Sequence, residues 1–170
     1  DIVNSDPVFV GGEDFGYTSL PGAEGSSYSA HVTLKKNNDE MIYVGANDGM
    51  LHAIDADIDV ADADEGKELF AFVPNAAISD ELATLVNPNY SHKYFVDGSP
   101  NAGDVYFDGA WHTIVVASMG RGSTTQETNP DGDLDGTADD PDLQTGVGGR
   151  SLFALDVTNP ESFSAGNVLW

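Results

Sequence analysis

The stretch IYVGANDGMLHAIDA, residues 42–56, decides the fold of this chain. Two runs of β-branched, aromatic and aliphatic residues stand on either side of Asn47-Asp48-Gly49. Asparagine, aspartate and glycine tolerate the positive φ angles of a tight turn, so the three together favour a hairpin. The sequence therefore predicts two antiparallel strands, at 41–46 and 50–55.

Further strand-like runs lie on both sides of this hairpin. They occupy residues 7–10, 68–73, 104–107, 112–118, 151–156 and 167–170. The turn sequence DGAW at 108–111 separates two of the later runs, as Asn47-Asp48-Gly49 does in the earlier hairpin. One helix is expected over 79–87, with Ser79 or Asp80 as its N-cap and Pro88 ending it. These patterns predict an almost entirely β fold.

The later strands repeat the earlier ones. IYVGANDGMLHAIDA aligns with VVASMGRG and RSLFALDV, and GKELF aligns with GNVLW. Asp55 then corresponds to Asp156, Phe70 to Trp170, and Asp6-Pro7 to Ser99-Pro100. Four short strands repeated in order are typical of propeller blades. We expect an all-β fold: a partial β-propeller of about two four-stranded antiparallel blades, with long insertions and one short helix.

All 170 residues are expected to belong to one propeller domain. Blade one spans about 6–75, a helix and loop about 76–98, and blade two about 99–170 with an acidic insertion at 123–147. Two blades cannot close a ring of four to eight, so we expect an open piece of a propeller. Trp111 and Trp170 are expected to be blade-packing residues.

The charge balance restricts the possible partners. The chain has 29 acidic and 6 basic residues, for a formal net charge of −23. Such a surface repels phosphate backbones and anionic lipids, so nucleic acid and bare membranes are poor partners. No run approaches the ~18 apolar residues of a membrane span, and the first residues lack the pattern of a signal peptide. Without cysteine, disulfides and thiolate metal sites are excluded.

Several stretches carry a family resemblance. They are DIVNSDPVFVG, IYVGANDGMLHAIDA with GKELFAFVPNA, NYSHKYFVDGSPNAGDVYF, WHTIVVASMGRG and GGRSLFALDVTNP. Together and in this order they resemble the C-terminal propeller of the PilY1/PilC family of type IV pilus biogenesis factors and tip adhesins. The resemblance implies a modified seven-bladed, quinoprotein-like propeller exported to the cell surface.

The same resemblance implies a function. It points to a non-enzymatic module that supports pilus assembly and surface attachment, associated with the type IV pilus or the outer membrane without direct membrane insertion. The implied partners are minor pilins or other regions of the same adhesin, together with cell or abiotic surfaces. The family's calcium loop lies in a later blade, so the resemblance assigns no calcium ligand in this chain.

The run DGDLDGTADDPD, residues 131–142, follows the spacing of a calcium-binding loop. Carboxylates stand at positions 1, 3, 5, 9 and 12, and Gly136 occupies position 6, where the chain must turn. The predicted Ca²⁺ ligands are Asp131, Asp133, Asp135, Thr137 through its carbonyl, Asp139 and Asp142. Aspartate replaces the usual glutamate at position 12, which makes bidentate closure weaker. The bound ion would order the insertion.

A disordered acidic spacer is the alternative interpretation of this run, because it would have a similar composition. The run DADIDVADADEG at 55–66 provides a comparison within the chain. It is as acidic, yet Val60 replaces the turn glycine and Ala63 stands at the ninth position. Spacing rather than charge therefore favours calcium at 131–142.

The main rival function is a pyrroloquinoline-quinone-dependent dehydrogenase, because quinoprotein blades share the patterns YVGANDG, HAIDA and GKELF. Such an enzyme ordinarily has adjacent cysteines over its cofactor and a tryptophan after GKEL. This chain has no cysteine, and Phe70 replaces that tryptophan. A purely structural propeller fragment is a third possibility. We expect no enzyme activity.

The four histidines show no metal-ligand spacing on one element. His52 and His112 are expected on sheet faces, and His92 in a loop packed against the sheet. No serine lies in a nucleophile elbow, and no glycine-rich stretch has the lysine of a phosphate loop. The acidic run is therefore the one candidate site that the sequence offers.

Overall fold

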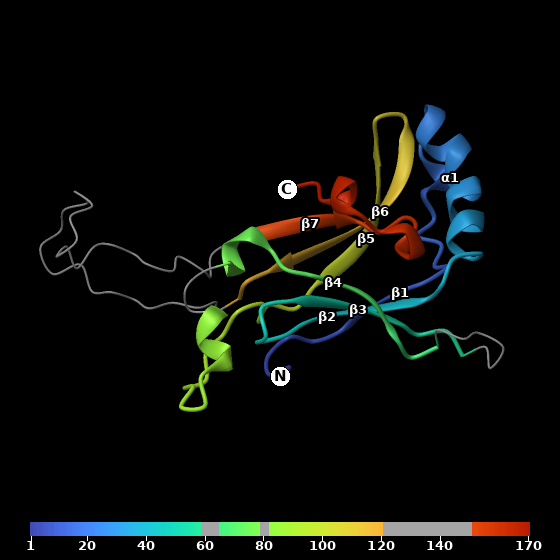
Figure 1. Cartoon of the computed structure of the whole chain (residues 1–170). Coiled ribbons are helices and arrows are strands. Elements are labelled where there is room, and N and C mark those ends of the chain that lie inside the picture. Colours follow the sequence, from blue (N-terminus) through green and yellow to red (C-terminus); the bar gives the residue numbers. More distant parts are fainter. Residues whose placement is uncertain (59–64, 79–81, 121–150) are drawn as a thin grey trace, which may run out of the picture.

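The computed structural model describes residues 1–58, 65–78, 82–120 and 151–170. In these ranges the chain forms two antiparallel sheets packed against each other, with one α-helix beside the second sheet (Figure 1). The fold is mostly β and does not close on itself, which confirms the predicted partial propeller.

The first sheet contains the hairpin on which the prediction rests. Its strands are β1 (Val8–Val10), β2 (Met41–Gly45), β3 (Leu51–Asp55) and β4 (Glu68–Phe72), in that spatial order. Gly49 has a φ of 95°, so the turn between β2 and β3 needs the residue that the sequence supplies. A bulge in the pairing of β3 with β4, between Ala53 and Ile54, places Phe70 opposite Ala53.

The second sheet has three full strands. They are β5 (Asn101–Phe107), β6 (Ala110–Ser118) and β7 (Leu152–Asp156). The predicted strand at 167–170 is shorter than expected: Val168 forms an isolated bridge with Leu155, and Ala154 bonds to the backbone of Leu169 and Trp170. A 3₁₀ turn at Ala165–Asn167 occupies the start of this segment, so the extended ladder is confined to its last residues.

The two sheets confirm the internal alignment at several positions. Asp55 and Asp156 each end the third strand, and each carboxylate accepts a hydrogen bond from the N–H two residues later. Trp170 lies beside Ala154 as Phe70 lies beside Ala53. The repeat in the sequence is therefore a repeat of strand order and pairing.

The hydrophobic core lies between the sheets. Its buried members are Met41, Tyr43, Leu51, Ala53, Ala77, Val96, Val115, Ala117, Met119, Phe153, Leu155 and Val157. Phe70 of the first sheet stacks on Phe163, which follows β7, with ring centroids 3.9 Å apart. Alternate residues of each strand point into this core, as expected for sheets packed on one face.

The helix was predicted in the wrong place. The α-helix, α1, spans Gly22–Lys35, whereas the described part of 79–87 forms a 3₁₀ helix at Leu82–Val86. The buried side of α1 consists of Gly25, Tyr28, His31, Val32 and Lys35. These positions recur at helical spacing, but three of the side chains are polar, so no apolar periodicity marks the helix in the sequence.

Short 3₁₀ helices complete the described structure. They lie at Tyr17–Ser19, Asn75–Ala77, Pro160–Ser162 and, as noted above, at Leu82–Val86 and Ala165–Asn167. The first of these turns contacts the start of α1 so closely that a Cβ on Gly25 would lie 1.9 Å from the carbonyl oxygen of Leu20. Gly25 is therefore required where the turn packs against the helix.

Candidate functional site

The calcium ligands predicted from sequence lie outside the described residues. This applies to Asp131, Asp133, Asp135, Thr137, Asp139 and Asp142. Across 1–58, 65–78, 82–120 and 151–170, no group of three or more histidine, aspartate or glutamate side chains is arranged to hold a metal ion. The candidate sites described below therefore come from other residues.

A buried polar cluster joins α1 to the second sheet. Its centre is Asp104 on β5, whose side chain is fully buried. Lys35 donates a 2.7 Å hydrogen bond to Asp104 Oδ2 and another of 2.7 Å to the carbonyl of Glu13. The hydroxyl of Tyr28 donates to the same carboxylate oxygen at 2.7 Å, and that of Thr113 donates to Oδ1 at 2.8 Å.

His31 completes this cluster, with Nε2 3.2 Å from Asp104 Oδ1. Burial alone raises the pKa of Asp104, but the hydrogen bonds from His31, Lys35, Tyr28 and Thr113 outweigh it and hold the pKa well below its usual range. Burial, and then the bond to Asp104, raise the pKa of the Tyr28 hydroxyl. The cluster is a satisfied ion pair, which fits a structural role better than proton transfer.

Aromatic rings cover one side of the cluster. Trp111 lies 4.7 Å from Tyr28 and stacks on Tyr17 at 5.2 Å between centroids, and its indole N–H donates to the carbonyl of Glu24. Trp111 thus packs between its own sheet and α1. A helix inserted between β1 and β2 covers this part of the second sheet, and no pattern in the sequence predicts it there.

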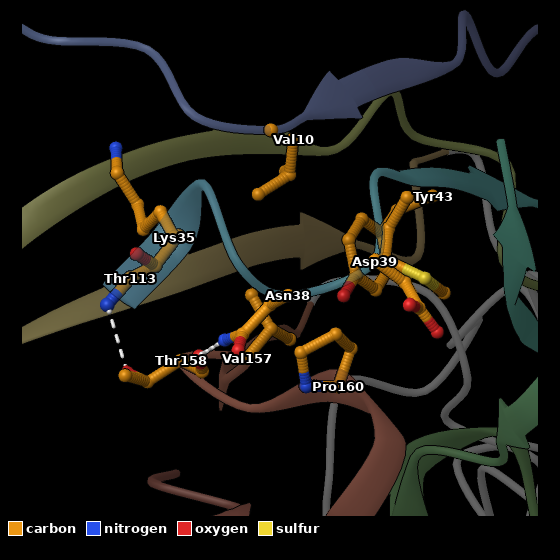
Figure 2. Close-up of a pocket in the computed structure, with 11 residues that line it drawn as sticks. Val10, Lys35, Asn38, Asp39, Tyr43, Thr113, Val157, Thr158 and Pro160 are labelled. Carbon is orange, nitrogen blue, oxygen red and sulfur yellow. Dashed lines mark hydrogen bonds between the residues drawn. The ribbon is translucent and has the colours of Figure 1, made fainter. Parts of the chain in front are cut away.

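A small cavity lies where the end of α1, β2 and β6 meet the loop after β7 (Figure 2). Thr158 organises it by accepting hydrogen bonds from Thr113 N–H at 3.0 Å and from the Asn38 side chain at 2.7 Å. The cavity is about 10 Å³, which is room for about one water molecule. It is too small for a substrate.

Tyr43 lines this cavity, and its buried hydroxyl has no hydrogen-bond partner among the described residues. Burial raises its pKa, so the group stays a neutral phenol at physiological pH.

The other histidines pair with carboxylates on the surface of the sheets. His52 on β3 contacts Glu68 and lies 3.0 Å from Asp48 Oδ2, and His112 on β6 lies 2.7 Å from Asp156 Oδ2. His52 and His112 are partly exposed strand residues, as predicted. His92 itself is exposed and contacts Tyr94, and the loop that carries it packs against the sheets through the buried residue Val96, as predicted.

The His112–Asp156 pair also contributes to a lowered pKa of Asp156. Burial raises the pKa of Asp156, but bonds from Thr158 and His112 outweigh it and lower the pKa overall. In the described ranges no serine or threonine nucleophile bonds to His112, so the pair does not form a catalytic triad.

Equivalent residues of the two repeats meet along a seam between the sheets. Asn4 donates to Asp97 Oδ2 at 2.8 Å, Ser5 to the carbonyl of Gly98 at 3.3 Å, and the N–H of Asp6 to Ser99 Oγ at 2.9 Å. Each pair is separated by 93 residues, so the segment before β1 lies alongside its own counterpart before β5. The seam aligns the two sheets.

Many of the described buried polar groups bond within the chain. Core packing and these bonds join the two sheets and α1, and the cavity in Figure 2 has room for about one water molecule. None of the described helices combines the length and apolar character needed to cross a bilayer.

Comparison with known proteins identifies the family. A family model for the PilY1 beta-propeller domain matches residues 1–139. The chain belongs to the PilY1 beta-propeller family. It is 39% identical over its full length to a "Type IV pilus biogenesis factor PilY1 homolog" of Xylella fastidiosa, and 34% identical to the "Type IV pilus biogenesis factor PilY1" of Pseudomonas aeruginosa PAO1.

A solved PilY1 structure agrees with this assignment. The crystal structure of the Pseudomonas aeruginosa PilY1 C-terminal domain matches 95% of the chain with a TM-score of 0.56 and 31% identity. The match covers 24% of that solved chain, and the chain spans 10% and 12% of the two PilY1 relatives named above. The comparison therefore concerns one part of a PilY1 protein.

Proposed function

We propose that this chain is a non-enzymatic structural module of a type IV pilus biogenesis factor, acting at the cell surface in pilus assembly. The match of residues 1–139 to the PilY1 beta-propeller domain carries this proposal. The contacts of the described residues support it, because the buried polar groups of α1, β5 and β6 join structural elements. The proposed partners are minor pilins or other regions of the same protein, and cell or abiotic surfaces.

A genetic substitution tests the role in pilus assembly. Asp104→Asn, introduced into the chromosomal gene, should destabilise this module and strongly reduce surface pili, measured by shearing and immunoblotting. Lys36→Met, at an exposed neighbour of the buried Lys35, is the matched control and should leave piliation unchanged. Normal piliation with a module shown by limited proteolysis to be unfolded would contradict the proposal.

The quinoprotein alternative makes a different prediction. If the module carried pyrroloquinoline quinone, the purified protein reconstituted with that quinone would oxidise alcohols or sugars with a dye as electron acceptor. Phe70, which replaces the expected tryptophan, stacks on Phe163 within the core. This placement favours a packing role for Phe70.

We further propose that residues 131–142 bind calcium, through Asp131, Asp133, Asp135, the carbonyl of Thr137, Asp139 and Asp142. The support is the alternation of carboxylates around Gly136, since Ca²⁺ prefers six to eight oxygen ligands from one flexible loop. The ion would offset the repulsion of closely spaced aspartates in a chain of formal net charge −23. Its proposed role is to order the insertion for contact with a partner.

Calcium should therefore raise the melting temperature and slow proteolysis of this segment. At calcium concentrations 100-fold above the dissociation constant, binding to the folded state alone adds about 2.7 kcal/mol to stability. Asp131→Asn with Asp133→Asn should abolish both effects. Asp62→Asn with Asp64→Asn, in the equally acidic run at 55–66, should leave them intact. Identical melting and digestion in calcium and in chelator would sink the proposal.

A further inference from the structure

A second cavity lies between the first strands of the two sheets and is far larger than the one in Figure 2. Its volume is about 260 Å³, which would hold about nine water molecules at roughly 30 Å³ each. Val8 and Val10 of β1 line one side, and Ala102 and Gly103 of β5 line the other. A cavity slightly smaller than those that bind drug-sized ligands suits a molecule with a single ring.

The internal repeat explains why this space is not filled by the chain itself. The seam relates the segment before β1 to the segment before β5 at a separation of 93 residues. At the same separation, Phe9 of β1 corresponds to Ala102 of β5. Ala102 pairs with the core residue Val115, so its side chain faces the first sheet. An alanine therefore stands where the first repeat has a phenylalanine, and the smaller side chain leaves room between β1 and β5.

Lys35 gives the cavity a polar side. Its ammonium donates 2.7 Å hydrogen bonds to Asp104 Oδ2 and to the carbonyl of Glu13. An ammonium carries three N–H groups, so one is left for a further acceptor. The nitrogen is directed away from the small cavity of Figure 2 and lies 4.8 Å from the ring centroid of Phe15, which also lines the larger cavity. The larger cavity thus combines apolar walls with one hydrogen-bond donor.

The charges beside the cavity favour a neutral ligand. Asp104 neutralises Lys35, and the carboxylate of Glu13 accepts a 3.0 Å bond from the N–H of Gly11. An anionic ligand would be repelled by both carboxylates, in a chain of formal net charge −23. A cationic ligand would be repelled at short range by the Lys35 ammonium. A neutral molecule with an acceptor oxygen meets neither repulsion.

We propose that this cavity binds a neutral aromatic molecule of about ten non-hydrogen atoms that carries one carbonyl oxygen. The ring packs among Val10, Ala102 and Phe15, and the oxygen accepts the remaining N–H of Lys35. Aryl ketones and aryl amides have this chemistry. The cavity is then a ligand site enclosed by the two sheets and the end of α1.

A matched series of small ligands tests the proposed chemistry. The probe is para-fluoroacetophenone, and its binding to protein purified from the cells that produce it is measured from the fluorine NMR line width. We expect a dissociation constant of about 1 mM or lower. Acetophenone should displace the probe, whereas ethylbenzene, which lacks the acceptor, and the charged benzoate and benzylammonium should each be roughly tenfold weaker or more. Equal displacement by all four, or no binding of the probe, would overturn the proposal.

Substitutions locate the binding in this cavity. Ala102→Phe introduces the residue of the first repeat, so it should abolish probe binding and leave the melting temperature unchanged or higher. Ala110→Phe is the matched control, because it makes the same change at an exposed residue of β6 and should keep binding. Phe15→Leu, at a residue 49% exposed, decides the matter if Ala102→Phe does not fold, and it should weaken binding roughly threefold or more. Unchanged binding in folded Ala102→Phe, or in Phe15→Leu, would overturn the proposal.

Discussion

Asp104→Asn should destabilise the chain by about 3–5 kcal/mol, as expected when one partner of a buried ion pair is removed. The carboxylate accepts bonds from Tyr28, Lys35 and Thr113 and lies 3.2 Å from His31. An amide cannot neutralise the Lys35 ammonium, whose side chain is 5% exposed. The free energy of unfolding in urea measures the loss.

Two controls separate the ion pair from general damage to α1. Lys36→Met lies on the exposed side of the same helix end and should change stability by less than about 0.5 kcal/mol. Lys35→Met combined with Asp104→Asn should recover part of the loss, because no charge is then left buried. A loss below about 1 kcal/mol for Asp104→Asn alone would contradict a structural ion pair.

The pH dependence of this variant has a defined sign. The folded-state pKa of Asp104 is lowered, so its contribution is fully present above the unfolded pKa of about 4 and is lost as pH falls below that value. The difference in stability between the parent chain and Asp104→Asn should therefore be largest near neutral pH and should shrink below about pH 4. A difference that grew on acidification would exclude this explanation.

Leu155→Ala should cost about 2–5 kcal/mol, because it leaves a cavity in the core between the sheets. Leu155 is 0% exposed and lies on β7. Leu152 on the same strand faces the other way, so Leu152→Ala is a matched control with the same change in chemistry. In the isolated chain that control should cost well under 1 kcal/mol.

The pair of leucine variants also tests how the two sheets are joined. If they unfold as one unit, Leu155→Ala lowers the urea midpoint of a single transition and leaves its slope unchanged. Two separate transitions, or equal losses for Leu155→Ala and Leu152→Ala, would show that the core between the sheets does not hold them together.

The strands were predictable from sequence because local patterns specify them. The turn at Asn47-Asp48-Gly49 and the alternation along β6 are visible without any knowledge of the neighbouring strands. The fourth strand of the second sheet was overestimated, because a 3₁₀ turn limits Val168 to a single bridge. The length of this strand depends on its pairing with β7, which the local sequence does not indicate.

The helix and its cluster were not predictable by the same means. α1 docks through Tyr28, His31 and Lys35, so its buried side lacks the apolar stripe by which helices are recognised. Asp104 lies 69 residues after Lys35, and nothing in either neighbourhood indicates that they meet. The available sequence signal for the buried side of the helix was the helical spacing of His31 and Lys35 from Tyr28. Their common partner, Asp104, is known only from the folded structure.

The position of α1 limits which parts of this chain can be exchanged with those of a homologue. By sequence the helix lies between the first two strands of one sheet, yet its hydrogen bonds run to β5 and β6 of the other. A chimera that exchanged either sheet for a homologous one would separate Lys35 from Asp104 or Trp111 from its helix. The smallest transplantable unit is therefore the pair of sheets, and grafts that respect this boundary should retain solubility where single-sheet grafts aggregate.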